Sequence, residues 1–109
     1  MNKLVLAIIN NEDSAIVASA LTAEGFIVTK LSTTGGFLMV GNTTLLIGTD
    51  EEHLDLLRST IKKYSSKRKQ INPSSAAFGR SMKNYDVPEE VVVGGATIFV
   101  LDVASMEKL

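Results

Sequence analysis

Side chains suited to binding a small anionic ligand are concentrated in one stretch, Thr29 to Gly48, which reads TKLSTTGGFLMVGNTTLLIG. The Gly35-Gly36 pair lets backbone amides approach a ligand without interference from a Cβ, and consecutive amides in a turn can hold an anion. The hydroxyl of Thr29 can donate to a phosphate oxygen. Asn42 carries both an acceptor and a donor, the pair needed to bind an adenine edge. The stretch therefore suggests one wall of a nucleotide-binding site.

Two aromatic residues and a second glycine pair extend this interpretation. Phe37 and Phe99 could contact a base, and such stacking is worth about 1–3 kcal/mol in nucleic-acid complexes. Gly94-Gly95 offers a second close approach of the backbone. A structural interpretation competes, because threonine is common in strands, glycine in turns and phenylalanine in cores. Residue spacing alone favours the structural interpretation.

Catalytic chemistry finds little support in the sequence. The chain has no cysteine and a single histidine, His53, which we interpret as a solvated helix residue and not as a base or a metal ligand. Most carboxylates stand where helices are expected to begin, and Asp102 is interpreted as a strand-end residue facing solvent. Neither a phosphate loop nor a dinucleotide fingerprint occurs. We expect no enzyme activity, no bound metal and no cofactor.

Length, charge and hydrophobic pattern limit the kinds of partner and cellular location that we expect. The 109 residues are enough for one domain, 1–109, and a net charge of −1 provides no positive field for nucleic acid. No apolar run approaches the roughly 18 residues that span a bilayer, so we expect no membrane insertion. The apolar stretch Leu4–Ile9 is interrupted by Asn10-Asn11-Glu12-Asp13, which favours a buried strand over a signal peptide and predicts a cytoplasmic protein.

A basic run, Lys62, Lys63, Lys67, Arg68 and Lys69, holds five of the 11 positive charges. Cations near the carboxyl end of a helix are stabilised by its dipole, so a solvated face is the first interpretation. The alternative is that this run, with Arg80 and Lys83, helps to close a loop over an anionic ligand.

Hydrophobic periodicity predicts the elements that position these residues. Strands are expected at Leu4–Ile9, Phe26–Leu31, Thr43–Gly48, Glu90–Val93 and Ala96–Val103, the last pair being one strand split at the glycines. A first helix, capped by Asn11 or Asp13, should run to about Glu24, stop at Gly25 and bury a stripe of Ile16, Val17, Ala20, Leu21 and Ala23. A second, opened by a capping box at Thr49–Glu52, should bury Leu54, Leu57, Ile61 and Tyr64.

This order predicts an α+β, ferredoxin-like βαββαβ fold, with an antiparallel sheet and two helices on one face. Residues 65–89 lack periodicity and carry both prolines, which predicts one long flexible loop. Two helices cover only one face of such a sheet, yet Leu4–Ile9 offers apolar side chains to both faces. We therefore expect a second copy of the chain to cover the other face.

Three separated blocks, Thr29–Leu38, Gly41–Thr44 and Val91–Val100, together resemble the PII-like cyclic-di-AMP receptor family of Gram-positive bacteria. The resemblance covers nearly the whole chain and implies a homotrimer that binds cyclic di-AMP between subunits. The loop after the second strand and the long loop after the second helix would border the pocket and reorganise on binding. A downstream protein partner is implied, but its identity is not.

The resemblance also implies roles for individual residues. Thr29 would contact phosphate or ribose, Phe37 and Leu38 would form a wall under one adenine, and Asn42 would bind an adenine edge. Gly48 would allow close backbone approach, as the residue types already suggest for Gly35 and Gly36, and Phe99 would line the pocket from the last strand. Further candidate positions are Ile27, Val28 and Lys108.

Three positions depart from the family pattern. Better-known members carry an arginine at the position of Ile27, often an asparagine at Gly25, and a glutamine at Lys108. A missing arginine removes a charge-assisted contact worth about 1.5–3 kcal/mol, or roughly tenfold to a hundredfold in affinity. Two other functions stay open beside the cyclic-di-AMP receptor. One is a PII-type adaptor that senses ATP or another adenine nucleotide, and the other is a hydrolase of adenine dinucleotides that depends on Asp102.

Overall fold

The computed structural model describes residues 1–31, 41–71 and 90–109. In this part of the chain, strand β1 (Lys3–Asn10) leads into helix α1 (Asn11–Ala23), and β2 (Ile27–Leu31) and β3 (Asn42–Thr49) follow. A short 3-10 helix (Glu51–His53) then opens α2 (Leu54–Ser65), and β4 (Arg68–Ile71), β5 (Glu90–Val93) and β6 (Ala96–Asp102) complete the order. The predicted separation of the last two strands at Gly94-Gly95 is confirmed.

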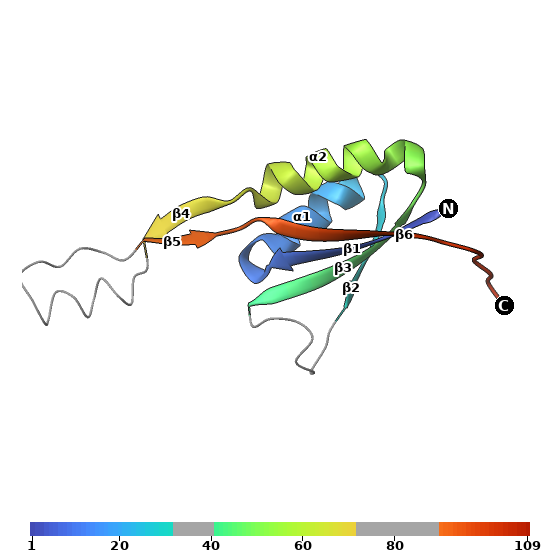
Figure 1. The fold of residues 1–109 in the computed structure, drawn as a ribbon, viewed down its shortest axis with the longest axis horizontal. Helices are drawn as coiled ribbons and strands as arrows, with labels where there is room; N and C mark the ends of the chain where they lie inside the picture. Colours follow the sequence, from blue (N-terminus) through green and yellow to red (C-terminus); the bar gives the residue numbers. More distant parts are fainter. Residues whose placement is uncertain (32–40, 72–89) are drawn as a thin grey trace, which may run out of the picture.

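Four strands form an antiparallel sheet in the order β2-β3-β1-β6, and both helices pack on one face of it (Figure 1). The predicted ferredoxin-like architecture is confirmed. The central strand β1 pairs with β3 along one side and with β6 along the other, so Leu6 lies between Leu46 and Phe99. Each strand therefore presents alternate residues to the helices and to the opposite face.

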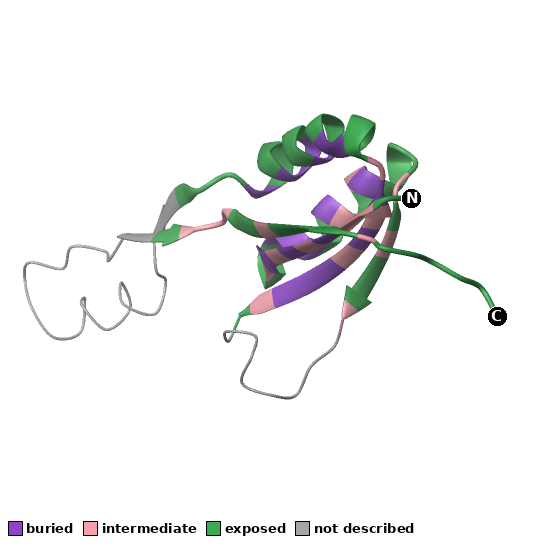
Figure 2. Cartoon of the chain, turned by 45° about the vertical axis from the view of Figure 1, so that its right-hand side comes forward, coloured by how far each residue is buried: buried purple, intermediate pink, exposed green. Residues whose placement is uncertain are grey.

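The core lies between the sheet and the helices, as the buried residues in Figure 2 show. Val5, Ala7, Ile9, Leu45 and Ile47 of the sheet have no exposed surface. From the helices, Val17, Leu21 and Leu57 are equally buried. The predicted α2 face is right for Leu54, Leu57 and Ile61 and wrong for Tyr64, which is exposed while Ser65 is buried.

The α1 stripe differs from its prediction. Ser14, Val17 and Leu21 are buried, whereas Ile16 and Ala23 are exposed. The buried face also includes Asp13 of the first turn, which takes part in an ion pair. Gly25, at φ 96°, ends the helix in the left-handed conformation that the sequence predicted.

Both helix starts also differ from their predictions. Asn10 caps α1, since its Oδ1 accepts a hydrogen bond from the Glu12 amide at 2.9 Å, and neither Asn11 nor Asp13 does so. The capping box at Thr49–Glu52 does not form. The Asp50 side chain makes no capping hydrogen bond and instead accepts a hydrogen bond from the Asn2 amide. A 3-10 turn precedes α2.

Residues 68–71 correct the prediction of one continuous loop. They form β4, which pairs with β5 in a separate two-stranded sheet in the register Arg68↔Val93 to Ile71↔Glu90. We call β4 and β5 the arm; it extends away from the end of the sheet opposite the two chain termini (Figure 1). Ser65 belongs to α2, Ser66 and Lys67 connect it to β4, and residues 72–89 of the predicted loop lie outside the described residues.

Candidate functional site

The face of the sheet without helices, here called the bare face, brings together predicted site residues that are far apart in the sequence. Strand register places Thr29, Leu46, Leu6 and Phe99 side by side across it. Ile27 and Gly48 lie in the next row, opposite Leu4 and Leu101. Ile27 is 72% exposed and Phe99 52% exposed. The structure thus assembles an apolar surface with a threonine hydroxyl at the β2 edge.

Asn42 stands at the first position of β3, where it pairs with Asn10 of β1. Alternation along β3 gives Asn42 the same side as Leu46 and Gly48, so it belongs to the bare face as well. Gly35, Gly36, Phe37 and Leu38 lie outside the described residues, and their predicted roles stay predictions.

Gly25, Ile27 and Gly48 line a common cavity of about 240 Å³ at the opposite end of the sheet from Asn42. The sequence singled out these positions separately. A Cβ on Gly48 would collide with Sδ of Met1, so the close approach predicted there is made in this structure by the Met1 side chain. The arrangement explains why a glycine is suited to this point of β3.

Two candidate positions lie elsewhere. Val28 points to the helix-covered face, where it packs against the core cluster. Lys108 lies in the exposed segment after β6. The Val28 side chain therefore faces away from those of Thr29 and Asn42.

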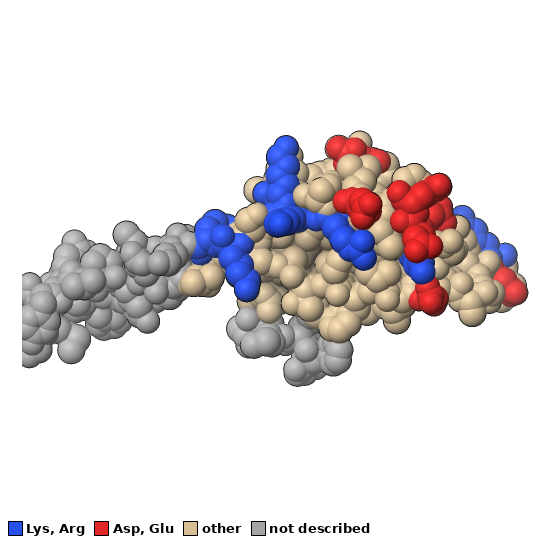
Figure 3. Space-filling view, turned by 45° about the horizontal axis from the view of Figure 1, so that its top comes forward, with Lys and Arg blue, Asp and Glu red and all other residues tan. Residues whose placement is uncertain are grey.

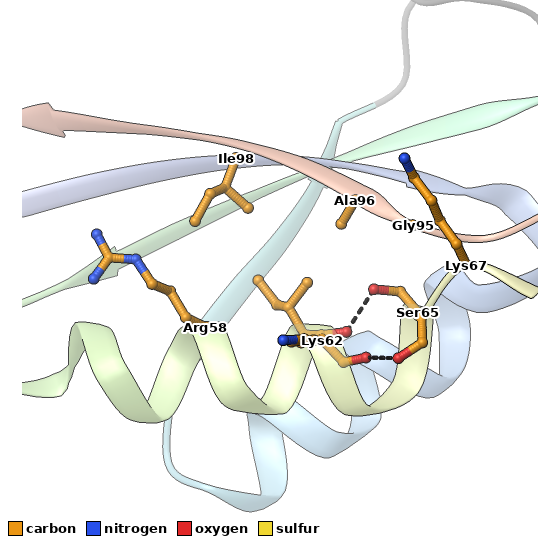
Figure 4. Close-up of a pocket in the computed structure, with 9 residues that line it drawn as sticks. Arg58, Lys62, Ser65, Lys67, Gly95, Ala96 and Ile98 are labelled. Atoms are coloured by element: carbon orange, nitrogen blue, oxygen red, sulfur yellow. Dashed lines mark hydrogen bonds between the residues drawn. The ribbon is translucent and has the colours of Figure 1, made fainter.

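A further cavity of about 440 Å³, which the sequence did not predict, lies between α2 and β6 (Figure 4). Ile61 and Ile98 contribute apolar side chains, and Arg58, Lys62 and Lys67 contribute cations. The signal was present, because Arg58 and Lys62 are four residues apart and therefore share one helix face. The basic run thus partly lines a concave surface, in addition to being solvated.

Charge is distributed unevenly along α2. One group of Lys and Arg side chains lies near the arm, whereas the visible Asp and Glu side chains lie away from it, with further Lys or Arg side chains beside them (Figure 3). Just before α2, ligand atoms of Asp50, Glu52 and His53 come within 4.8 Å of one another, with Glu52 and His53 exposed. The Asp50 carboxylate already accepts a hydrogen bond from the Asn2 amide, so it has a structural role within the chain.

Asp102 faces solvent at the end of β6, as predicted, with its side chain 86% exposed. It accepts a hydrogen bond from Nζ of Lys3 on the neighbouring strand β1, and this bond raises the pKa of Lys3. A carboxylate that is exposed and paired in this way has the features of a strand-end ion pair.

Comparison with known proteins agrees with this architecture. A family model described as "Cyclic-di-AMP receptor" matches residues 2–109. The chain is also similar to a crystal structure from Pediococcus pentosaceus ATCC 25745, of a protein described as functionally unknown. That similarity has a TM-score of 0.73 and 39% sequence identity and covers 99% of this chain and 97% of the other.

Within the described residues, no helix is long and apolar enough to cross a membrane. The family match spans practically the whole chain, including the bare face, both helices and the arm. The chain therefore belongs to the cyclic-di-AMP receptor family and is a regulatory receptor that binds cyclic di-AMP.

Proposed function

We propose that the bare face, together with the start of β3, forms one wall of the cyclic-di-AMP site, and that neighbouring copies in a homotrimer complete it. The proposal is carried by one observation. Ile27, Thr29, Asn42, Gly48 and Phe99 are spread over the sequence, yet strand register puts all five on the same face.

The position of Phe99 supports a site between copies. Thr29 is on one edge strand of the sheet and Phe99 on the other, with β3 and β1 between them. Three strand spacings separate them, or roughly 14 Å. A ligand in a seam between copies could contact Thr29 and Asn42 of one copy and Phe99 of the next, without having to span the whole sheet.

Exposed apolar side chains support assembly through the same face. Ile27, Phe99 and Leu101 are all exposed there, whereas Val5, Leu45 and Ile47 on the opposite face are buried by the helices. Burial of apolar surface stabilises association by about 25 cal/mol per Å² before the costs of association are subtracted. A trimer that turns three bare faces inward would remove these side chains from water.

The chemistry of the wall suits binding without turnover. Asn42 can pair with an adenine edge, Thr29 can donate to phosphate or ribose, and Phe99 can pack on a base. In the described residues, Asp102 is paired with Lys3 and His53 is exposed in a 3-10 turn, so neither is set beside this wall as a base. We therefore propose a receptor that is not an enzyme and that signals to a protein partner.

Calorimetric titration tests the ligand. Cyclic di-AMP, cyclic di-GMP, ATP and AMP are each titrated into the protein, and binding preference for cyclic di-AMP is expected. Absence of heat with cyclic di-AMP at high micromolar protein would overturn the proposal. Preference for ATP would favour the adaptor that senses an adenine nucleotide.

A matched pair of variants on β6 tests the location. Phe99→Ala removes a side chain from the bare face, whereas Val100→Ala changes the next residue, on the other face. Cyclic-di-AMP affinity should fall in the first and stay near wild type in the second. Light scattering should give three times the 11.7 kDa chain mass, and a monomer in dilute solution would contradict the assembly.

A further inference from the structure

The first turn of α1 contacts two parts of the chain that are distant in sequence. On one side, the Asn11 amide donates to the Gly41 carbonyl at 2.8 Å, and Asn11 Oδ1 accepts a hydrogen bond from the Thr43 hydroxyl. Gly41 and Thr43 flank Asn42, the predicted adenine-binding residue. The residues on both sides of Asn42, one through its backbone and the other through its side chain, are therefore held by one residue of the helix.

On the other side, the same turn holds the arm. Asp13 accepts two hydrogen bonds from the Arg68 guanidinium, from Nη2 at 2.7 Å and from Nη1 at 3.2 Å. The Asp13 side chain is only 7% exposed, whereas that of Arg68, the first residue of β4, is 44% exposed. Two parallel bonds to one carboxylate fix orientation as well as distance. This hydrogen bonding also raises the pKa of Arg68, which remains charged.

The Gly94-Gly95 link between β5 and β6 packs against this ion pair. Gly94 and Gly95 have φ values of 84° and 86°, which favour glycine. A Cβ on Gly94 would meet the Ser66 carbonyl oxygen at 2.5 Å and Nη1 of Arg68 at 2.6 Å. The Gly95 amide donates to the Ser65 carbonyl. Both connections of the arm are thus tied to Arg68 and to the end of α2.

The arm depends on this base for its order. Its described ladder has four residue pairs, and a two-stranded ribbon by itself is at best marginally stable in water. Asn11 and Asp13 belong to one helical turn, so a displacement of that turn moves both sets of contacts together.

We propose that the first turn of α1 couples the ligand site to the arm, with Asn11 contacting the segment around Asn42 and Asp13 holding Arg68. Asn11 and Asp13 are positioning residues, and this inference rests on the proposed cyclic-di-AMP site. Ligand that orders the start of β3 strengthens the Asn11 contacts and, through the same turn, the attachment of the arm. Such coupling is reciprocal in free energy.

The test measures amide hydrogen exchange of peptides that contain β4 and β5, first without ligand. Thr43→Val removes the hydroxyl that donates to Asn11, and Asp13→Asn removes the charge that holds Arg68. Each should speed exchange of the arm by about 2- to 30-fold, the range expected for coupling through a packed element. In the double variant, Thr43→Val should add little to the effect of Asp13→Asn, because the route is already broken.

Matched controls keep the result interpretable. Thr44→Val changes the neighbouring hydroxyl, on the bare face, and Glu24→Gln removes an exposed charge at the other end of α1. Neither should alter exchange of the arm, and Thr43→Ser, which keeps the hydroxyl, should behave as wild type. Unchanged exchange in Thr43→Val, or full additivity in the double variant, would overturn the coupling.

Repeating the exchange measurement with cyclic di-AMP distinguishes failure of this inference from failure of the proposed function. Cyclic di-AMP should slow exchange of the arm in wild type and Thr43→Ser, and the effect should be lost in Asp13→Asn although ligand still binds. If wild type binds no cyclic di-AMP, the proposed function fails, and the ligand-free cycle still decides whether the helix turn couples the two segments. If the ligand binds and leaves exchange of the arm unchanged, the coupling to the ligand site is wrong.

Discussion

Both faces of the sheet carry apolar residues, but helices cover only one of them. On the helix-covered face, Val5, Ala7, Leu45 and Ile47 have no exposed surface. On the bare face, Leu4 and Leu6 of the same central strand are only partly buried, and Phe99 of the neighbouring strand is exposed. Figure 2 shows the contrast along single strands, where buried and less buried residues alternate.

This contrast suggests that the two faces have different roles, one in stability and the other in binding. Residues on the covered face hold the chain together, because each is packed on all sides. Residues on the bare face are free to contact a ligand or another copy. A change on one face should therefore alter unfolding, and a change on the other should alter binding or assembly.

The largest effect is expected on the covered face. Leu57→Ala empties a fully buried site in α2 and should lower the free energy of unfolding by about 2–5 kcal/mol. Urea denaturation measures it. Phe99→Ala, studied at dilution where copies are separated, should change stability much less. Equal losses in the two variants would mean that the faces do not divide these roles.

A gain is expected on the bare face at Ile27. Ile27→Arg supplies the cation that better-known family members carry, and a charge-assisted hydrogen bond to a phosphate is worth about 1.5–3 kcal/mol. Affinity for cyclic di-AMP should rise roughly tenfold to a hundredfold in calorimetry. Ile16→Arg, at an exposed apolar position of α1, adds the same charge away from the wall and is the control. Similar gains in both would indicate non-specific attraction.

A smaller loss is expected at Asn42. Asn42→Ala removes the amide proposed to bind an adenine edge and should weaken binding by about 0.5–1.5 kcal/mol, the worth of a neutral hydrogen bond. The proposed trimer should remain intact in light scattering. Phe37→Ala, in the segment before Asn42, should also weaken binding. Wild-type affinity in both variants would place the pocket elsewhere.

The smallest effect concerns pH. Hydrogen bonding to Asp102 raises the pKa of Lys3 above its ordinary 10.5, so the pair stabilises the fold below that pH, and this contribution is lost as pH rises through the folded-state pKa. The difference in stability between wild type and Lys3→Met should therefore be steady near neutrality and shrink above pH 10.5. Lys30→Met, at an exposed position of β2, provides the comparison. A difference that persists unchanged at high pH would contradict the role of the pair.

Periodicity predicted most of the fold for a physical reason. Runs such as Leu4–Ile9 are long enough to specify a strand, and Leu54, Leu57 and Ile61 specify a helix face. The strand β4 was missed because Arg-Lys-Gln-Ile has no apolar alternation, and it is ordered by pairing with β5. Asn10 was missed as the α1 cap because it is also the last residue of β1.

The candidate site was predictable only in part. Residue chemistry and family resemblance together singled out Thr29, Asn42 and Phe99 as candidates, and strand register puts them on one face. The contacts of Asn11 and Asp13 join residues 32 and 55 positions apart, and nothing in local spacing signals them. The cavity between α2 and β6 likewise depends on how two elements pack.

The uneven charge along α2 has a consequence for the rate of ligand capture. The chain carries a net charge of −1, so a distant anion is not attracted as a whole. Near the surface, however, Lys62 and Lys67 stand at the end of α2 where the arm begins, while Asp50, Glu51 and Glu52 lie just before its other end. A cyclic dinucleotide, whose two phosphodiesters each carry one negative charge, is therefore turned towards the arm as it arrives by diffusion, and added salt should slow its arrival more than it hastens its departure.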